Sequence, residues 1–229
     1  MTGNYWTEFW IEQGKSSAGH NPQSRVLRTL QKQPISADNW EQTVEYVSGK
    51  LALESEFRLL DLCGGNGLFA RHMADQCQQV VVVDISGSLL EGVNENTGNI
   101  TGIQSDMREA EFADASFERV LWYAALQYLT LQESVAMFSR IYNWLAPGGE
   151  LFVGDIPDAS RRWDFFDNPE RRAAYFHGLE AGRPIVGTWF EKEWLQFLAT
   201  NTGFRSADVL SQPEYQIYSW FRFDMLCRK

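Results

Sequence analysis

Between residues 57 and 154 the chain alternates short β-branched and aliphatic runs with segments of helical periodicity, and this pattern most constrains the fold. The runs that predict strands are Phe57–Leu62, Gln79–Val83, Ile100–Gln104, Arg119–Tyr123 and Glu150–Gly154. The segments that predict helices are Leu68–Gln76, Ser86–Asn94 (capped by Ser86) and Leu131–Leu145 (ended by Pro147-Gly148-Gly149). Runs without alternation indicate strands buried on both faces, so we predict an α/β fold with a doubly wound, mostly parallel sheet.

The two ends of the chain depart from this alternation. Residues 38–53 have helical spacing with Asp38 as N-cap, and Phe190–Thr200 also predicts a helix. Phe204–Leu210 and Trp220–Cys227 predict a strand pair that can place one antiparallel strand in the sheet. We expect a single domain over residues 1–229, with an N-terminal segment, 1–37, and a partly helical insertion, 156–188.

Composition excludes several classes of partner. Twenty basic and thirty acidic residues give a net charge of −10, which disfavours a nucleic-acid partner. Val80–Val83, the longest aliphatic run, is too short for a membrane span, and residues 1–10 show no signal peptide. Cys63, Cys77 and Cys227 are few and scattered, which favours a reducing, cytoplasmic location. With no cluster of His and carboxylate residues at ligand spacing, we expect no metal.

A glycine-rich turn follows the first predicted strand. Gly65-x-Gly67-x-x-Ala70 satisfies a relaxed dinucleotide fingerprint, although a tight turn without a ligand has the same glycines. Asp61, at the end of the strand, repels a diphosphate but attracts a cation by about 4 kcal/mol at 4 Å and an effective dielectric of 20. The turn therefore favours a ligand with a positive end.

Two further acids close the next two predicted strands. Asp84 can accept hydrogen bonds from both ribose hydroxyls, and Asp106 can reach an adenine amino group. Each acid alone is an ordinary turn residue or helix cap. Three acids at the ends of successive strands indicate a nucleoside ligand with a positive end.

With these residues the chain resembles the class I S-adenosylmethionine (SAM)-dependent methyltransferases over about residues 40–155, and loosely over the last 40. The matching segments are Asp61–Gly67 (the DxGxGxG motif), Val82–Ser86, Ser105–Met107, Phe117–Val120 through Leu126–Leu129, and Leu145–Leu151 (the LxPGGxL motif). Cys63 replaces the first glycine of the motif. We expect a small, non-catalytic thiol to be tolerated there if the position needs no positive φ.

The resemblance implies a Rossmann-like, seven-stranded sheet with its last strand antiparallel. It also implies SAM as cofactor, with S-adenosylhomocysteine (SAH) as product. In this family Asp61 and the glycines hold the methionine part of SAM, Asp84 the ribose, and Asp106 with Met107 the adenine. The cofactor-binding residues we expect are Asp61, Cys63, Gly64, Gly65, Gly67, Asp84, Ile85, Asp106, Met107 and Tyr123.

The acceptor side is less defined. His177 or Asp155 is the expected general base, although Asp155 can instead anchor the substrate or hold the pocket together. Segments 1–37 and 156–188 can form a lid, or their aromatic residues can be ordinary packing. The arginines of the insertion can bind an anionic acceptor or pair with nearby acids. The substrate-binding candidates are Trp10, His20, Trp163, Phe166 and Tyr175.

These features predict a methyltransferase acting on an O or N atom of a small metabolite, of natural-product or saccharide type. Neither the tetrapeptide of base amino-methylases nor a Pro-Cys nucleophile is present, which disfavours nucleic-acid substrates. The alternatives are an NAD(P)-dependent oxidoreductase, against which Asp61 argues, and a SAM-binding module without catalysis. The oligomeric state stays open.

Overall fold

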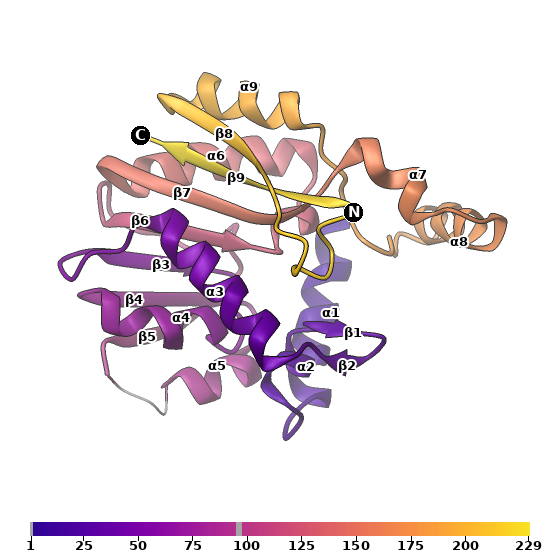
Figure 1. Ribbon diagram of the computed structural model, residues 1–229, viewed down its shortest axis with the longest axis horizontal. Helices are drawn as coiled ribbons and strands as arrows, with labels where there is room; N and C mark the ends of the chain where they lie inside the picture. Colours follow the sequence, from indigo (N-terminus) through magenta and orange to yellow (C-terminus); the bar gives the residue numbers. More distant parts are fainter. Residues whose placement is uncertain (1, 95–97) are drawn as a thin grey trace.

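The computed structural model describes residues 2–94 and 98–229 and contains a seven-stranded sheet with helices on both faces (Figure 1). The strands lie in the order β5-β4-β3-β6-β7-β9-β8. Their bounds are β3 Arg58–Leu62, β4 Gln79–Asp84, β5 Ile100–Gln104, β6 Phe117–Tyr123, β7 Leu145–Pro157, β8 Ser206–Ser211 and β9 Arg222–Arg228. Strands β3 to β7 are parallel, and β9 is antiparallel to both β7 and β8. The predicted fold class, including the antiparallel strand near the C-terminus, is confirmed.

Different helices cover the two faces of the sheet. Val81 and Val83 of β4 pack in one core with α6 and α9, whereas Val80 and Val82 pack in another with α3, α4 and α5. The bounds of these helices are α3 Ala37–Leu51, α4 Leu68–Met73, α5 Gly87–Asn94, α6 Leu131–Trp144 and α9 Lys192–Thr202. Burial on both faces explains why the run Val80–Val83 is apolar without alternation.

The strand order reverses at β3, which has β4 on one side and β6 on the other. In open α/β sheets, ligands bind at such a switch point, outside the carboxyl ends of the strands. The topology therefore places a binding site beside the glycine-rich turn after β3.

The N-terminal segment lies across this end of the sheet, and the 156–188 segment projects from the body of the molecule (Figure 1). The N-terminal segment contains α1 Thr2–Ser16, α2 Pro22–Arg25 and the short hairpin strands β1 Thr29–Leu30 and β2 Gln33–Pro34. The projecting segment contains α7 Arg162–Phe165 and α8 Pro169–Glu180. In the part of the chain that the structure describes, none of the helices is long and apolar enough to cross a membrane.

Two expected helix caps were wrong, and one strand begins earlier than expected although the helix before it ends as predicted. The N-cap of α3 is Ser36, whose hydroxyl accepts from Asn39 N, so Asp38 lies in the first turn instead. The buried hydroxyl of Ser86 has no hydrogen-bond partner within residues 2–94 and 98–229, so it does not cap α5. The Pro147–Gly149 turn lies inside β7, because a shift in the pairing register between Phe117 and Arg119 of β6 accommodates the extra residues.

Candidate functional site

A cavity of about 370 Å³ opens at the carboxyl ends of the central strands. Its floor is formed by the residues that follow β3, β4 and β6 and by Asp155 of β7. Helix α1 contributes Trp6 and Trp10 to its wall, and the opposite wall contains Phe165 and Phe221. Elements from both ends of the chain therefore enclose the site that the sheet topology predicts.

Three non-glycine residues on the cavity floor have left-handed backbone conformations. Cys63 follows β3 with φ 62°, Ala124 follows β6 with φ 56°, and Asp155 within β7 has φ 62°. Such a conformation costs a side-chain-bearing residue about 1–2 kcal/mol and recurs at functional sites. The condition that we attached to a thiol at position 63, that the residue needs no positive φ, is therefore not met, because the chain turns there toward α4.

Asp61 is fully buried, and its Oδ2 atom has no hydrogen-bond partner among the described residues. Burial, and then the charge of Asp84, raise the pKa of the Asp61 carboxyl to about 7. A Cβ at Gly64 would lie 2.5 Å from Oδ2, so glycine leaves the room that this carboxylate occupies. An unsatisfied buried carboxylate oxygen in a cavity suits a cationic group, and the ammonium group of SAM is one.

Asp84 is also buried, but both of its oxygens accept backbone hydrogen bonds. Oδ2 accepts from Gly65 N and Oδ1 from Ser86 N, each at 2.9 Å. Burial raises the pKa of the Asp84 carboxyl to about 6, although these hydrogen bonds oppose the shift. Each carboxylate oxygen can accept a second hydrogen bond, so the oriented carboxylate fits a ribose diol.

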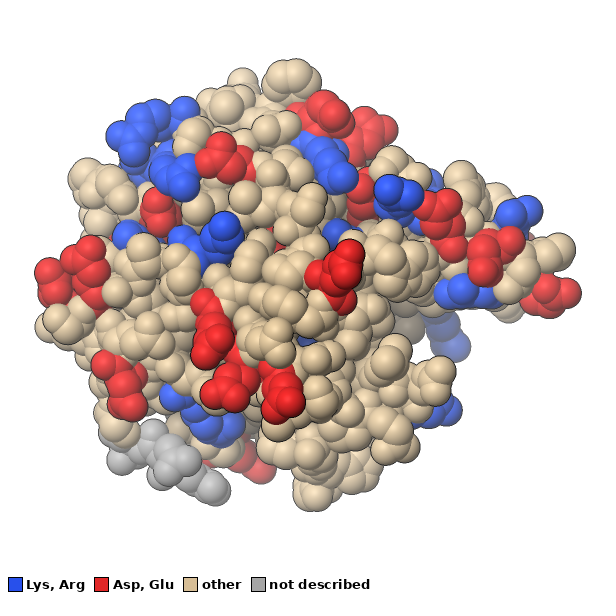
Figure 2. Space-filling view, viewed as in Figure 1, with Lys and Arg blue, Asp and Glu red and all other residues tan. Residues whose placement is uncertain are grey.

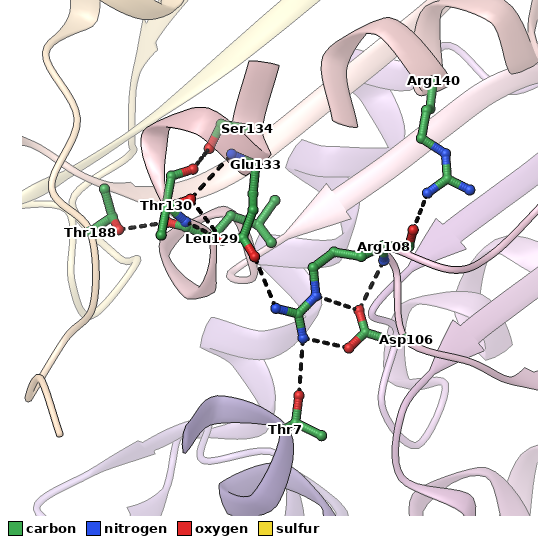
Figure 3. A network of polar contacts seen from close by, with 9 residues as sticks. All are labelled: Thr7, Asp106, Arg108, Leu129, Thr130, Glu133, Ser134, Arg140 and Thr188. Carbon is green, nitrogen blue, oxygen red and sulfur yellow. Dashed lines mark hydrogen bonds and ion pairs between the residues drawn. The ribbon is translucent and has the colours of Figure 1, made fainter. Parts of the chain in front are cut away.

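Asp106 is tied into a polar network that the sequence did not reveal (Figure 3). The Arg108 guanidinium donates to both Asp106 oxygens at 2.9 and 2.5 Å, to Glu133 of α6 at 3.1 Å and to Thr7 of α1 at 3.0 Å. Burial raises the pKa of Asp106, but the hydrogen bonds and charge of Arg108 outweigh it, so the pKa is lowered. The network holds α1 against this edge of the cavity.

On the other side of the cavity, two arginines from opposite ends of the chain meet Asp155. Arg28 Nη1 lies 3.1 Å and Arg222 Nη1 3.2 Å from the same oxygen, Oδ2, and Gln212 Nε2 lies 3.3 Å from Oδ1. Burial raises the pKa of the Asp155 carboxyl, but the charges of Arg222 and Arg28 more than compensate, so the pKa is lowered. A carboxylate held in this way is a weak proton acceptor, so the geometry favours the alternative in which Asp155 holds the pocket together.

We call Asp61, Asp84 and Asp106 the acid half of the cavity, and Arg28, Asp155 and Arg222 the arginine half. The acid half lies at the ends of β3, β4 and β5, and the arginine half lies beside β7 and β9. Tyr123 at the end of β6 lies between them, with the Arg28 guanidinium 4.4 Å from its ring centroid.

The cavity brings most of the predicted cofactor residues together. Those that line it are Asp61, Cys63, Gly64, Gly65, Asp84, Ile85, Asp106, Met107 and Tyr123. Gly67 is not in its lining and instead starts α4 with φ 71°. Cys63 Sγ lies 3.5 Å from Met107 Sδ, so the thiol packs in the wall as expected.

The acceptor-side candidates are mostly elsewhere. Of these, Trp10 and Asp155 line the cavity, but His177 on α8 and His20 after α1 are exposed and lie outside it. Trp163 is exposed, Phe166 is buried in a cluster with Trp189 and Phe221, and Tyr175 borders a different, shallower pocket. Sequence reasoning missed Arg28, Arg222 and Tyr218, because no local motif marks them.

The arginines of the projecting segment are engaged locally. Arg161 pairs with Asp164 and Arg171 with Asp167, and both pairs are exposed. The alternative of pairing with nearby acids therefore describes Arg161 and Arg171, whereas Arg172 donates to the carbonyl oxygens of Phe166 and Asp167. Among the described residues, no group of three or more His, Cys, Asp or Glu side chains is arranged to hold a metal ion.

Residues 59–149 match the family described as "Methyltransferase domain". The ubiquinone/menaquinone biosynthesis C-methyltransferase UbiE of Haemophilus ducreyi is 31% identical over 105 residues, which are 42% of this chain and 40% of that protein. Phosphoethanolamine N-methyltransferase 3 of Arabidopsis thaliana is 30% identical over 168 residues, or 69% of this chain and 33% of that protein. The chain thus spans less than half of the length of these two relatives.

Among solved structures, phosphoethanolamine N-methyltransferase 1 of Haemonchus contortus, in complex with phosphoethanolamine and SAH, superposes with a TM-score of 0.71. It is 15% identical, and the match covers 99% of this chain and 48% of that one. At this identity the likeness shows the fold alone.

Proposed function

We propose that this chain is a class I SAM-dependent methyltransferase, and that it transfers a methyl group from SAM to an oxygen or nitrogen atom of a small metabolite. The observation that carries the proposal is the buried Oδ2 of Asp61, which has no partner in the described part of the chain, beside the backbone-held carboxylate of Asp84 in one cavity. SAM has an ammonium group at its amino-acid end and a ribose, which match these two carboxylates. When bound, SAM supplies an activated methyl group on a positively charged sulfur.

The acid half binds and orients the cofactor in this proposal. Asp61 accepts hydrogen bonds from the ammonium group, and Asp84 accepts them from the ribose hydroxyls. Gly64 leaves room for the Asp61 carboxylate, and Gly65 leaves room for the Val26 side chain of the N-terminal segment. Ile85 and Met107 form apolar surface for the adenine, next to the Asp106–Arg108 pair.

The aromatic walls position the acceptor and exclude water. Trp6 and Trp10 of α1 pack against Tyr128, with ring centroids 4.6 and 5.7 Å apart, and all three residues line the cavity. Alignment of the reacting atoms and exclusion of water account for much of the catalysis of a displacement at an activated carbon. We therefore propose that segment 1–37 acts as a cover over the site, and that Phe165 and Val186 extend the cover from the 156–188 segment.

No histidine lines the cavity in the described part of the chain, and Asp155 is held by two arginines. Burial raises the pKa of the Tyr123 phenol well above its ordinary value, so it stays protonated. The acceptor atom therefore arrives ready to attack, as a neutral amine or an ionised oxygen. The rate should then rise with pH along the titration of the acceptor itself.

Two observations weigh against other functions. The buried carboxylate of Asp61 would repel a diphosphate, which disfavours an NAD(P)-dependent oxidoreductase. On the face drawn in Figure 2, basic and acidic side chains are interspersed, and the net charge is −10, which disfavours nucleic acid. A SAM-binding module without catalysis would share the acid half, so turnover has to be measured.

Calorimetric titration with SAH, with NADH as the control ligand, tests the proposal. We expect micromolar binding of SAH and none of NADH. Binding of NADH alone, or of neither ligand, would contradict it. A screen of amine and hydroxyl acceptors with SAM then separates an enzyme from a binding module by the appearance of SAH.

A further inference from the structure

The arginine half of the cavity has the composition of an anion site. We propose that the acceptor has a carboxylate or phosphate group, and that Arg28 and Arg222 bind it. This inference rests on the proposed function, because it names the chemical class of the acceptor in that reaction. It concerns the anchoring group of the acceptor, which is separate from the atom that receives the methyl group.

The two guanidinium groups have more donors than the protein satisfies. Both contact the same oxygen, Oδ2 of Asp155, at 3.1 and 3.2 Å, and Arg222 Nη1 also donates to the Asp155 carbonyl oxygen at 2.6 Å. The buried Nε of Arg222 has no hydrogen-bond partner among the described residues. Each guanidinium has five N–H donors in a planar fork, and one carboxylate oxygen cannot satisfy two forks. The remaining donors suit a second anion, which a ligand can provide.

The balance of charge around Arg28 and Arg222 also favours an anionic ligand. The side chains of Arg28 and Arg222 are 13% and 10% exposed, and Asp155 is the carboxylate that contacts them. Asp224 lies behind Asp155, where its Oδ1 accepts from Asp155 N and Gln212 Nε2, and it is not in the cavity lining. Burial raises the pKa of the Asp224 carboxyl to about 7, so it is partly protonated at neutral pH. A buried surplus of positive charge is costly unless an anion compensates it.

Aromatic rings hold both guanidinium groups in place. Arg28 lies over the ring of Tyr123 at 4.4 Å, and Arg222 lies 5.3 and 5.1 Å from the centroids of Tyr218 and Phe221. Stacking fixes the plane of a guanidinium and favours the two-point contacts that carboxylates and phosphates accept. All five residues line the cavity, so the oriented donors border the space where the acceptor has to bind.

The other arginine of the cavity is already compensated. Arg108 is paired with Asp106 and Glu133. The uncompensated positive charge is therefore confined to the arginine half, on the side of the cavity away from the carboxylates of the acid half. An anionic group bound there would leave the rest of the acceptor directed toward the acid half.

A matched pair of probes tests the inference. Protein saturated with SAH is titrated by calorimetry with benzoate and with benzamide, which share shape and differ in charge, at fixed ionic strength. We expect benzoate to bind at least about tenfold more tightly, which corresponds to about 1.4 kcal/mol. Phenyl phosphate, titrated in parallel, distinguishes a phosphate site from a carboxylate site by whichever anion binds more tightly.

Variants locate the effect. Arg222→Gln should reduce the preference for benzoate to less than threefold, and Arg222→Lys should retain part of it. Arg161→Gln, at an exposed arginine outside the cavity, should leave the preference unchanged. If Arg222→Gln does not fold, the comparison of benzoate with benzamide in the unmodified protein still tests whether the cavity prefers an anion.

Equal binding of benzoate and benzamide would overturn the inference, since the arginines would then serve only to tie the N-terminal segment to β7 and β9. An unchanged preference in folded Arg222→Gln would also overturn it. Failure of the proposed function shows separately, as absence of SAH binding in the first titration. The benzoate comparison is then made without SAH and still tests the anion site.

Discussion

The two halves of the cavity use carboxylates in opposite ways. In the acid half, Asp61 is buried, one of its oxygens has no partner among the described residues, and its pKa is raised to about 7. In the arginine half, Asp155 is equally buried, but two guanidinium groups satisfy it and its pKa is lowered. We propose that the first carboxylate binds a ligand and that the second is part of the framework. Removing the charge should therefore affect ligand binding in the first case and folding in the second.

The largest effect we expect is on stability, in Asp155→Asn. This change leaves two buried guanidinium groups without their anion, which should lower the free energy of unfolding by about 3–5 kcal/mol. Asparagine tolerates the left-handed backbone at this position, so the loss reports on charge. Urea denaturation measures it. Asp164→Asn, in an exposed ion pair, is the control and should cost less than 1 kcal/mol. A loss below 1 kcal/mol at Asp155 would remove the contrast between the halves.

The next effect is on ligand binding, in Asp61→Asn. Loss of the charge that meets the SAH ammonium should raise the Kd of SAH about 100-fold, or about 2.7 kcal/mol. The ligand-free variant should be more stable than the parent at pH 8, because it no longer buries an ionised carboxylate. Calorimetry and thermal melting measure the two quantities. Asp114→Asn, at an exposed position, is the matched control. An unchanged Kd would show that Asp61 does not contact the cofactor.

The halves should also differ in their response to pH. Because the pKa of Asp61 is raised from 3.8 to about 7, the native state retains a proton that the unfolded chain has released between these values. Stability of the ligand-free protein should therefore fall as the pH rises from 5.5 to 8, by roughly 2 kcal/mol from this group. Over the same range SAH affinity should rise about tenfold or more, as the carboxylate ionises.

The lowered pKa of Asp155 has the opposite effect on how folding stability changes with pH. Its stabilisation is present above the unfolded pKa of 3.8 and is lost as the pH falls below that value, outside this window. Urea denaturation and SAH calorimetry at pH 5.5 and 8 test both statements, with Asp61→Asn showing a smaller change. An SAH affinity that falls toward pH 8 would contradict the assignment of Asp61.

The smallest effect concerns the backbone of the cavity floor, where residues after β3 and β6 should respond alike although neither belongs to one of the two halves. Cys63→Gly and Ala124→Gly each remove a side chain from a residue at positive φ, near 60°. Relief of that strain exceeds the added entropy of the unfolded chain, so each variant should gain about 0.5–1 kcal/mol. Thermal melting measures the gain. Ala173→Gly, in the exposed part of helix α8, should instead lose about 1 kcal/mol. Destabilisation of Cys63→Gly would mean that its packing on Met107 outweighs the strain.

The acid half could be predicted from sequence because its residues come from one continuous segment. Asp61, the glycines and Asp84 follow successive strands of a β-α-β unit, and parallel strands bring their carboxyl ends to one edge of the sheet. The pairing of Asp106 with Arg108 was missed although the residues are two positions apart. The Arg108 guanidinium is also held by Thr7 of α1 and Glu133 of α6, and no local pattern brings these two residues to it.

The sequence by itself determined the parallel sheet, the antiparallel strand near the C-terminus and the cofactor edge, since local periodicity and short connections specify them. Only the tertiary structure decided the acceptor side. Arg28 and Arg222 lie 127 and 67 residues from Asp155 in the chain, and no repeat or motif links them. They meet because the N-terminal segment crosses the sheet and β9 runs antiparallel beside β7, so its first residue lies at the cavity. Contacts between segments so far apart depend on how whole elements pack, which local sequence does not encode.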